Sequence, residues 1–117
     1  MENYKLVSPE DLNHYGYLFG GNLLKWVDEY AWIAVSLDYP DCKFVTVAFD
    51  NIEFKKSVKE GSILKFIIEK EKIGNTSVKY QVNVYRSNHD TNKQDLIFST
   101  YVTFVCIDDQ DKKKSIP

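Results

Sequence analysis

The chain has 117 residues, of which 44% are hydrophobic and 15% aromatic, which is enough for the core of one folded domain and too little for two. Its formal net charge of -2 excludes an overall attraction to nucleic acid or to an anionic membrane surface. Residues 1–10 hold no long apolar run, and no stretch is long enough to cross a bilayer. We therefore expect a cytoplasmic protein with no signal peptide, and with neither nucleic acid nor a membrane as a partner.

The predicted elements alternate with short turns along the chain. A short strand is expected at residues 4–7. Residues 21–37 form the strongly helical stretch, which is apolar around most of its circumference and is expected to be surrounded by protein. Asp38, Tyr39 and Pro40 end this helix. Strands rich in β-branched and aromatic residues follow at 43–54, 62–72, 76–86 and 96–107, with a turn at 74–75 and a polar hairpin loop at 87–94.

The order of these elements predicts the fold class. Consecutive strands joined by tight turns favour an antiparallel sheet, and a single apolar helix needs a sheet to cover it. The predicted class is α+β, and the order β-α-β-β-β-β is that of the hotdog fold, in which an antiparallel sheet wraps around one long central helix. Residues 1–117 are expected to form a single hotdog domain, with residues from about 109 to 117 as a flexible tail.

Cys42 and Cys106 are the two cysteines of the chain, and they lie far apart in the sequence. A zinc cluster or a disulfide framework needs more cysteines at closer spacing. We therefore expect two free thiols and no metal site.

The segment from Asn13 to Asp28 carries the residues that most suggest chemistry. Gly20 and Gly21 stand at the start of the predicted helix, where open N–H groups and the helix dipole can hold a developing negative oxygen. A carboxylate such as Asp28 can serve as a general base or as a nucleophile. The alternatives are structural: the glycines can simply permit a tight turn, Asn13 can be a loop or capping residue, and Asp28 can be a solvated partner of Lys25.

The chain resembles the hotdog-fold acyl-CoA thioesterases of the bacterial short-chain and cytosolic acyl-CoA hydrolase type, over nearly its whole length. The resemblance rests on an ordered set of residues: the Asn-x-x-Gly-x-x-Phe-Gly-Gly stretch at 13–21, Asp28, Val45-Thr46-Val47, Phe54, Gly61, Gly74-Asn75-Thr76-Ser77 and Ile116-Pro117. It implies hydrolysis of an acyl-CoA to a carboxylic acid and coenzyme A, without a cofactor. Asp28 would then act on the thioester, Gly20 and Gly21 would form the oxyanion hole, and Asn13 would orient the water or the thioester.

The resemblance also implies where the rest of the substrate lies. Gly74, Asn75, Thr76 and Ser77 would lie along the coenzyme A, although these four residues are first of all a turn. Thr46 is a further candidate contact to the substrate. Lys56 and Arg86 are candidates for the nucleotide phosphates, against the plainer interpretation of solvated surface cations. The aromatic residues of the helix favour short or medium acyl groups if they line an acyl tunnel, and otherwise they fill the core.

Helix geometry constrains how such a site is assembled. Gly20 and Asp28 are eight positions apart, which places them roughly 12 Å apart along a helix. If both act on one thioester, the helix entrance of one subunit must meet Asp28 of another, which predicts a homodimer with two sites across its interface. The family resemblance suggests a trimer of dimers as the larger assembly.

Two other functions stay open at the level of sequence. A non-catalytic acyl-CoA-binding or sensor protein is compatible with the fold. Asp28 argues against it, because a pure binder has little use for a carboxylate beside an electrophilic carbonyl. A hotdog hydratase or dehydratase usually pairs a histidine with an acid, and neither His14 nor His89 lies on the predicted central helix.

Overall fold

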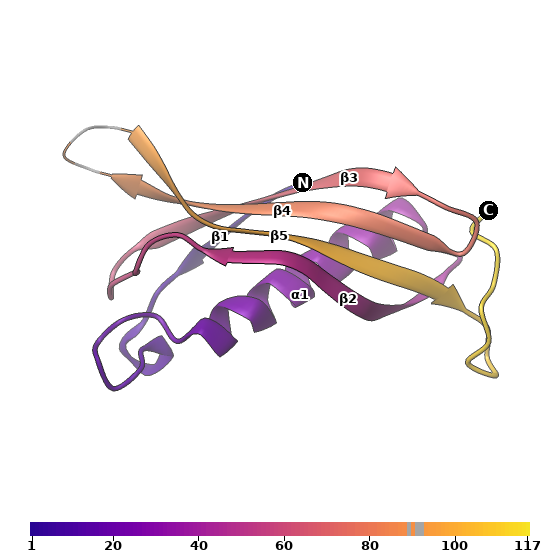
Figure 1. Ribbon diagram of the computed structural model, residues 1–117, viewed down its shortest axis with the longest axis horizontal. Helices are drawn as coiled ribbons and strands as arrows, with labels where there is room; N and C mark the ends of the chain where they lie inside the picture. The colour runs from indigo at the N-terminus through magenta and orange to yellow at the C-terminus, as the bar shows by residue number, and fades with distance from the viewer. Residues whose placement is uncertain (89, 91–92) are drawn as a thin grey trace.

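The computed structural model describes residues 1–88, 90 and 93–117. In these residues the chain forms one five-stranded antiparallel sheet and one long helix, which crosses a face of the sheet (Figure 1). The elements are β1 (Glu2–Leu6), the short 3-10 helix η1 (Pro9–Asp11), α1 (Gly20–Asp38), β2 (Lys43–Phe54), β3 (Ile63–Ile73), β4 (Ser77–Asn88) and β5 (Lys93–Ile107). The predicted α+β hotdog architecture is confirmed, with the helix and four long strands in the expected order.

The strand order across the sheet is β1-β3-β4-β5-β2, so β1 and β2 are its two edges. Every neighbouring pair is antiparallel, and β2 departs from regular register against β5 at two places. β2 begins soon after α1 ends, and it therefore brings the residues at its start next to the helix.

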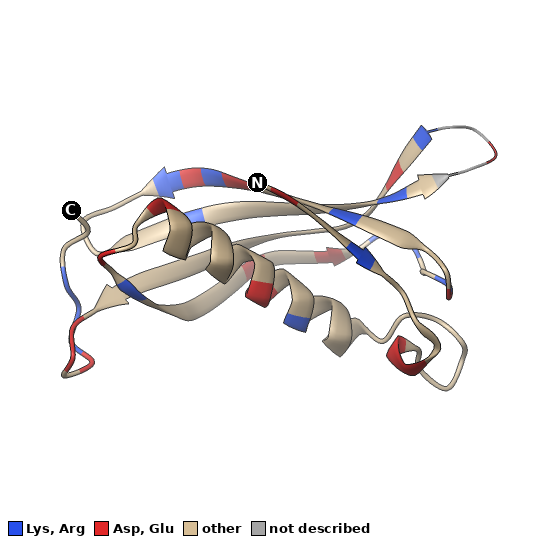
Figure 2. Cartoon of the chain, turned by 180° about the vertical axis from the view of Figure 1, so that it is seen from behind, with Lys and Arg blue, Asp and Glu red and all other residues tan. Residues whose placement is uncertain are grey.

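The core lies between α1 and the sheet. The helix buries one side of its surface through Leu23, Trp26, Val27, Ala31, Ala34 and Val35. The sheet contributes large, fully buried side chains to the same core, among them Leu64, Phe66, Tyr80, Phe98 and Phe104. Figure 2 shows how few charged residues α1 carries along its length.

The helix is covered on one side only within the single chain. Trp32 is 46% exposed and Leu37 is 69% exposed, although the apolar pattern predicts a helix surrounded by protein. The helix is therefore not surrounded by protein within the single chain.

The hairpin between β4 and β5 is longer than the sequence predicts. The expected loop at 87–94 is wrong at both ends, because Ser87 pairs with Gln94 and Asn88 pairs with Lys93 in the antiparallel ladder. Polar residues are compatible with a strand here, since Ser87, Lys93 and Gln94 are exposed. Asp90 lies in a turn, and residues 89 and 91–92 of the predicted loop lie outside the described residues.

The chain after β5 returns to the sheet, which differs from the flexible tail expected for residues 109–117. The Lys114 N–H donates to the Cys106 carbonyl over 2.9 Å, and the Ile116 N–H donates to the Asn75 carbonyl over 2.8 Å. The physical reason is that Ile116 is apolar and packs against the core. No helix in the described part of the chain is long and apolar enough to cross a membrane.

Candidate active site

Asn13 closes the loop that leads into α1. Its Oδ1 accepts hydrogen bonds from the backbone N–H of Tyr15 over 2.9 Å and of Tyr17 over 3.2 Å. The Asn13 N–H donates to the Tyr17 carbonyl over 2.7 Å, and Gly16 allows the reversal with a φ of 84°. Asn13 is therefore a turn-forming residue, as the structural alternative expected, while its side-chain N–H donors take no part in these bonds.

The first two residues of α1 leave their N–H groups open. Neither the Gly20 N–H nor the Gly21 N–H donates a backbone hydrogen bond within the described residues, whereas the Asn22 and Leu23 N–H groups both donate to the Phe19 carbonyl. Aromatic rings lie against both glycines. A Cβ on Gly20 would lie 3.3 Å from the Phe54 ring, and one on Gly21 would lie 2.8 Å from the Phe19 ring. A side chain at either position would therefore displace an exposed aromatic ring at the same place where open donors are present.

A cavity of about 300 Å³ lies beside this helix entrance. Its wall contains residues from the loop before α1, the start of α1, the end of β2 and the loop after it: Asn13, Tyr17, Gly20, Phe54, Lys56 and Ser57. The structure therefore brings together three of the residues that the sequence suggested for the site, namely Asn13, Gly20 and Lys56.

Asp28 lies further along the helix and is held by a residue of β2. The Thr46 hydroxyl donates to Asp28 Oδ1 over 2.6 Å, and both side chains are half-buried. They line a separate cavity of about 300 Å³ that also contains Lys25 and Trp32. No ion pair joins Lys25 to Asp28 within the described residues, so the carboxylate is oriented by a hydroxyl rather than paired with its helix neighbour.

Within one chain, the start of α1 and the Asp28 carboxylate do not line the same cavity. Gly20 and Asp28 lie on the same continuous helix, about 12 Å apart along its axis, and they line different cavities. Each cavity therefore contains only some of the residues that the sequence suggested for the site.

The turn at residues 74–77 lies at the other end of the molecule from the start of α1 (Figure 1). Its polar groups are engaged in the fold: the Gly74 N–H donates to the Ser77 carbonyl over 2.7 Å, and the Thr76 carbonyl accepts from the Cys106 N–H over 2.9 Å. Within one chain, Gly74, Asn75, Thr76 and Ser77 are therefore not brought together with Asn13 and Gly20.

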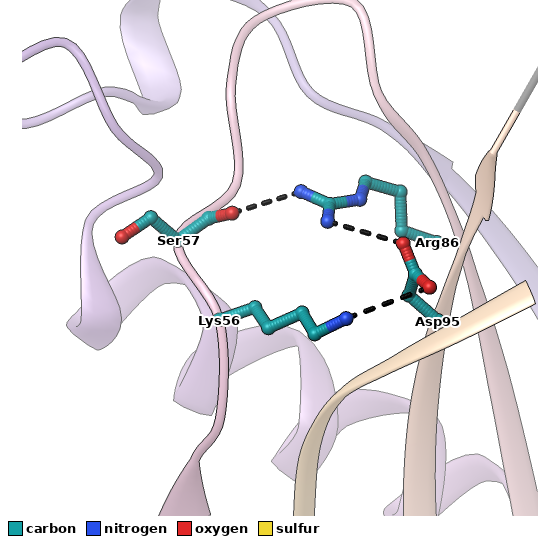
Figure 3. A network of polar contacts seen from close by, with 4 residues as sticks. All are labelled: Lys56, Ser57, Arg86 and Asp95. Atoms are coloured by element: carbon teal, nitrogen blue, oxygen red, sulfur yellow. Dashed lines mark hydrogen bonds and ion pairs between the residues drawn. The ribbon is translucent and has the colours of Figure 1, made fainter. Parts of the chain in front are cut away.

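Lys56 and Arg86 meet at a carboxylate that is not among the residues the sequence suggested. Figure 3 shows Arg86 of β4 and Lys56 of the β2–β3 loop on either side of Asp95 of β5. Arg86 Nη1 donates to the Ser57 carbonyl over 2.8 Å, and Arg86 Nη2 lies 3.4 Å from Asp95 Oδ2. Lys56 Nζ lies 3.5 Å from Asp95 Oδ1. The Arg86 guanidinium holds the pKa of Asp95 below its ordinary value.

Two relatives of this chain carry the same functional description. This chain is 26% identical to the uncharacterized acyl-CoA thioester hydrolase YkhA of Bacillus subtilis. The 113 aligned residues cover 95% of this chain and 64% of the relative. The chain is 30% identical over 112 residues to the uncharacterized acyl-CoA thioester hydrolase ZMO0511 of Zymomonas mobilis, covering 96% of this chain and 74% of that one. The chain thus spans less than the full length of both relatives.

Solved structures share the whole fold. An acyl-CoA hydrolase from Staphylococcus aureus, in complex with butyryl coenzyme A, coenzyme A and coenzyme A disulfide, is 32% identical, with a TM-score of 0.91 over 100% of this chain and 71% of that chain. A hexameric thioesterase from Yersinia pestis is 25% identical, with a TM-score of 0.88 over 98% of this chain and 93% of that chain. The family model of the thioesterase superfamily matches residues 15–92, and on this match the chain belongs to that superfamily.

Proposed function

We propose that this protein hydrolyses acyl-CoA thioesters, releasing a carboxylic acid and coenzyme A. The observation that carries the proposal is the 2.6 Å hydrogen bond that orients the half-buried Asp28 carboxylate through Thr46. A carboxylate held in one orientation beside a cavity can activate a water or attack a carbonyl. The open N–H groups of Gly20 and Gly21 would stabilise the negative oxygen that forms on the thioester.

The spacing of these residues supports the assignment. In the Staphylococcus aureus hydrolase, one asparagine, one aspartate and one threonine have each been replaced by alanine in solved structures. That asparagine and that aspartate are fifteen positions apart, as Asn13 and Asp28 are here. The threonine follows seventeen positions after the aspartate there, and Thr46 follows eighteen positions after Asp28 here. The three residue types recur in the same order at nearly the same spacing.

The proposed reaction divides the work among a few groups and needs no cofactor. Thr46 leaves one oxygen of the Asp28 carboxylate to face a water or the thioester carbon. If the water attacks, Asp28 accepts its proton; if the carboxylate attacks, water then cleaves the resulting anhydride, and in both routes the coenzyme A thiolate leaves. Asn13 would donate a side-chain N–H to the water or to the thioester.

We propose a short acyl-CoA as the substrate class, because butyryl coenzyme A binds the Staphylococcus aureus hydrolase. Lys56 lines the cavity at the helix entrance and is half exposed, which suits a contact to a nucleotide phosphate. Residues 74–77 remain candidates for the coenzyme A of a site formed with another subunit.

The complete site would need two subunits. Asp28 and Gly20 line separate cavities on one helix, so we propose a homodimer in which the helix entrance of one protomer faces Asp28 of its partner. The surface beside Asp28 is suited to a partner, since Trp32 is exposed and β2 is an edge strand with exposed Val45 and Val47. A trimer of such dimers would match the hexameric relative from Yersinia pestis.

Thiol release from a series of acyl-CoAs of rising chain length tests the function directly. We expect turnover by the wild type, greatest with short acyl groups, and a loss of at least 100-fold in Asp28→Asn. Glu71→Gln is the matched control, because it removes an exposed acid of β3 that lines neither cavity, and it should change turnover by no more than about twofold. Tight acyl-CoA binding with no release from any substrate would refute the hydrolase and favour a sensor.

A further inference from the structure

Four neighbouring residues of the loop between β2 and β3 form one wall of the cavity at the helix entrance: Lys55, Lys56, Ser57 and Val58. This wall has no regular secondary structure of its own, so its shape depends on what holds each backbone group. The Lys55 and Lys56 N–H groups both donate to the Ile97 carbonyl of β5, over 2.9 and 3.4 Å. Main-chain bonds therefore fix the first part of the wall to the sheet.

The far end of the wall is held in the same way from the opposite side. The Val58 carbonyl accepts from the Leu18 N–H over 2.7 Å, which ties the wall to the loop before α1. Between these attachments the Ser57 carbonyl accepts a side-chain donor, Arg86 Nη1, over 2.8 Å. The middle of the wall is thus held by Arg86.

Arg86 is itself held in place by Asp95, its cross-strand partner in the β4–β5 ladder. Their side chains are 24% and 23% exposed, and neither residue lines the cavity. Figure 3 shows the guanidinium reaching from Asp95 to the Ser57 carbonyl, with one nitrogen on each. A guanidinium with both terminal nitrogens engaged by the protein is poorly placed to bind a phosphate as well.

Lys56 differs from Arg86 in this network. Its side chain is 51% exposed, it lines the cavity, and it meets Asp95 through a single contact of 3.5 Å. A surface ion pair of this kind contributes little stability, so Lys56 can leave Asp95 for an anionic ligand at small cost.

We propose that Arg86 and Asp95 are positioning residues that fix the backbone of residues 55–58 as a wall of the substrate cavity and contact no substrate atom. This inference rests on the proposed acyl-CoA hydrolase function. It replaces the nucleotide-phosphate role that the sequence suggested for Arg86, and it leaves that role to Lys56.

Comparing two substrates separates positioning from phosphate binding. Butyryl coenzyme A carries the nucleotide phosphates, and butyryl-pantetheine lacks them. Arg86→Gln should raise KM for both substrates by a similar factor, roughly tenfold, because the wall is displaced in either case. Lys56→Ala should raise KM for butyryl coenzyme A alone. A rise confined to butyryl coenzyme A in Arg86→Gln would overturn the proposal and return Arg86 to the phosphates.

Hydrogen exchange gives a readout that does not depend on turnover. In Arg86→Gln, the amides of Leu18, Lys55 and Lys56 should exchange faster than in the wild type, while amides of the central strands keep their protection. The matched control is Lys65→Gln, which removes an ion pair with Glu2 at the β1 edge and should leave the loop unchanged. Loop protection equal to that of the wild type in Arg86→Gln would overturn the proposal.

Asp95→Asn provides a second variant for the same two measurements. An amide still accepts a hydrogen bond from Arg86 but lacks the charge that orients it, so the increases in KM and in loop exchange should have the same pattern and be smaller. No change in either would remove Asp95 from the proposal. If the wild type releases no thiol, the hydrolase function fails, and the exchange experiment still decides whether Arg86 holds the wall.

Discussion

Subunit complementation gives the sharpest test of a site shared between two protomers. Two variants are expressed together under different affinity tags: Asp28→Asn, which lacks the carboxylate, and Asn13→Ala, which disrupts the loop at the helix entrance. Dimers that carry both tags are purified. If the entrance of one protomer works with Asp28 of the other, one site of this heterodimer is intact and its second site carries both substitutions.

The size of the expected signal follows from the structure. Gly20 and Asp28 are separated by about 12 Å along α1, and a reacting atom must lie within about 3.5 Å of each catalytic group, so one chain cannot supply both. The heterodimer should therefore show about half of the turnover of a tagged wild-type dimer, which has two equivalent sites. The Asp28→Asn homodimer should show less than about 1%, since loss of a general base alone costs 100-fold or more. The Asn13→Ala homodimer should also show much less turnover than the heterodimer, because the loop at both of its helix entrances is altered.

A reciprocal heterodimer is the control. One protomer carries both substitutions and the other is wild type, so the total number of changes per dimer is the same. A shared site predicts that this dimer is inactive, because each of its sites contains one altered residue. A site within one chain predicts half activity here and none in the first heterodimer. That reversed pattern, in dimers confirmed by their mass, would refute the cross-subunit arrangement.

Three further substitutions test individual contacts. Thr46→Val should lower kcat about tenfold with little change in thermal stability, because the 2.6 Å hydrogen bond to Asp28 is lost, and Thr46→Ser should restore most of it. Tyr80→Phe should lower the free energy of unfolding at pH 7 by about 1 kcal/mol, since the buried hydroxyl donates to Asp38 over 2.5 Å. Burial, and after it the neighbouring Asp38, raise the pKa of the Tyr80 hydroxyl above 10.0. The unfolded chain therefore loses this proton at a lower pH than the folded chain, and the free energy of unfolding falls as the pH rises above about 10. Denaturant titrations of Tyr80→Phe should lack this part of the fall. Gly16→Ala should cost about 1–2 kcal/mol in thermal unfolding, because its φ of 84° strains any side chain although no atom lies nearby.

The elements of the fold could be predicted because each follows from a local pattern. The strand at residues 43–54 matches β2, and the predicted helix differs from α1 by one residue at each end. The helix is predicted by an apolar run that ends at Pro40, and the strands are predicted by alternating β-branched residues. Both patterns extend over only a few positions, so they can be interpreted without knowing any distant contact. The loop predicted at 87–94 is too long, and the two strands of the hairpin are correspondingly too short. Polar composition alone does not show where the pairing of two strands ends.

To predict the contacts of the candidate site, one must know how the elements align with one another. Amino-acid composition does not contain this information. Thr46 lies near Asp28 only because β2 crosses α1 at that level, and nothing in the seventeen residues between them determines the crossing. The pairing of Arg86 with Asp95 was more accessible. These residues stand immediately on either side of the predicted hairpin loop, so opposite charges facing each other across two antiparallel strands could have been inferred. The Ser57 carbonyl that Arg86 reaches could not.

The proposed active site and the exposed apolar surface of one chain lie at the same place. Asp28 and Thr46 lie where α1 meets β2, and this is also where Trp32 is exposed and where the edge strand presents Val45 and Val47. An edge strand with exposed apolar side chains is a ready surface for a second chain. A partner that covers this surface would complete the helix packing that the apolar pattern predicts, and the same partner would bring a second helix entrance toward Asp28. One association would then satisfy both the hydrophobic surface and the half site, which is why we expect folding stability and turnover to fall together when the dimer is diluted.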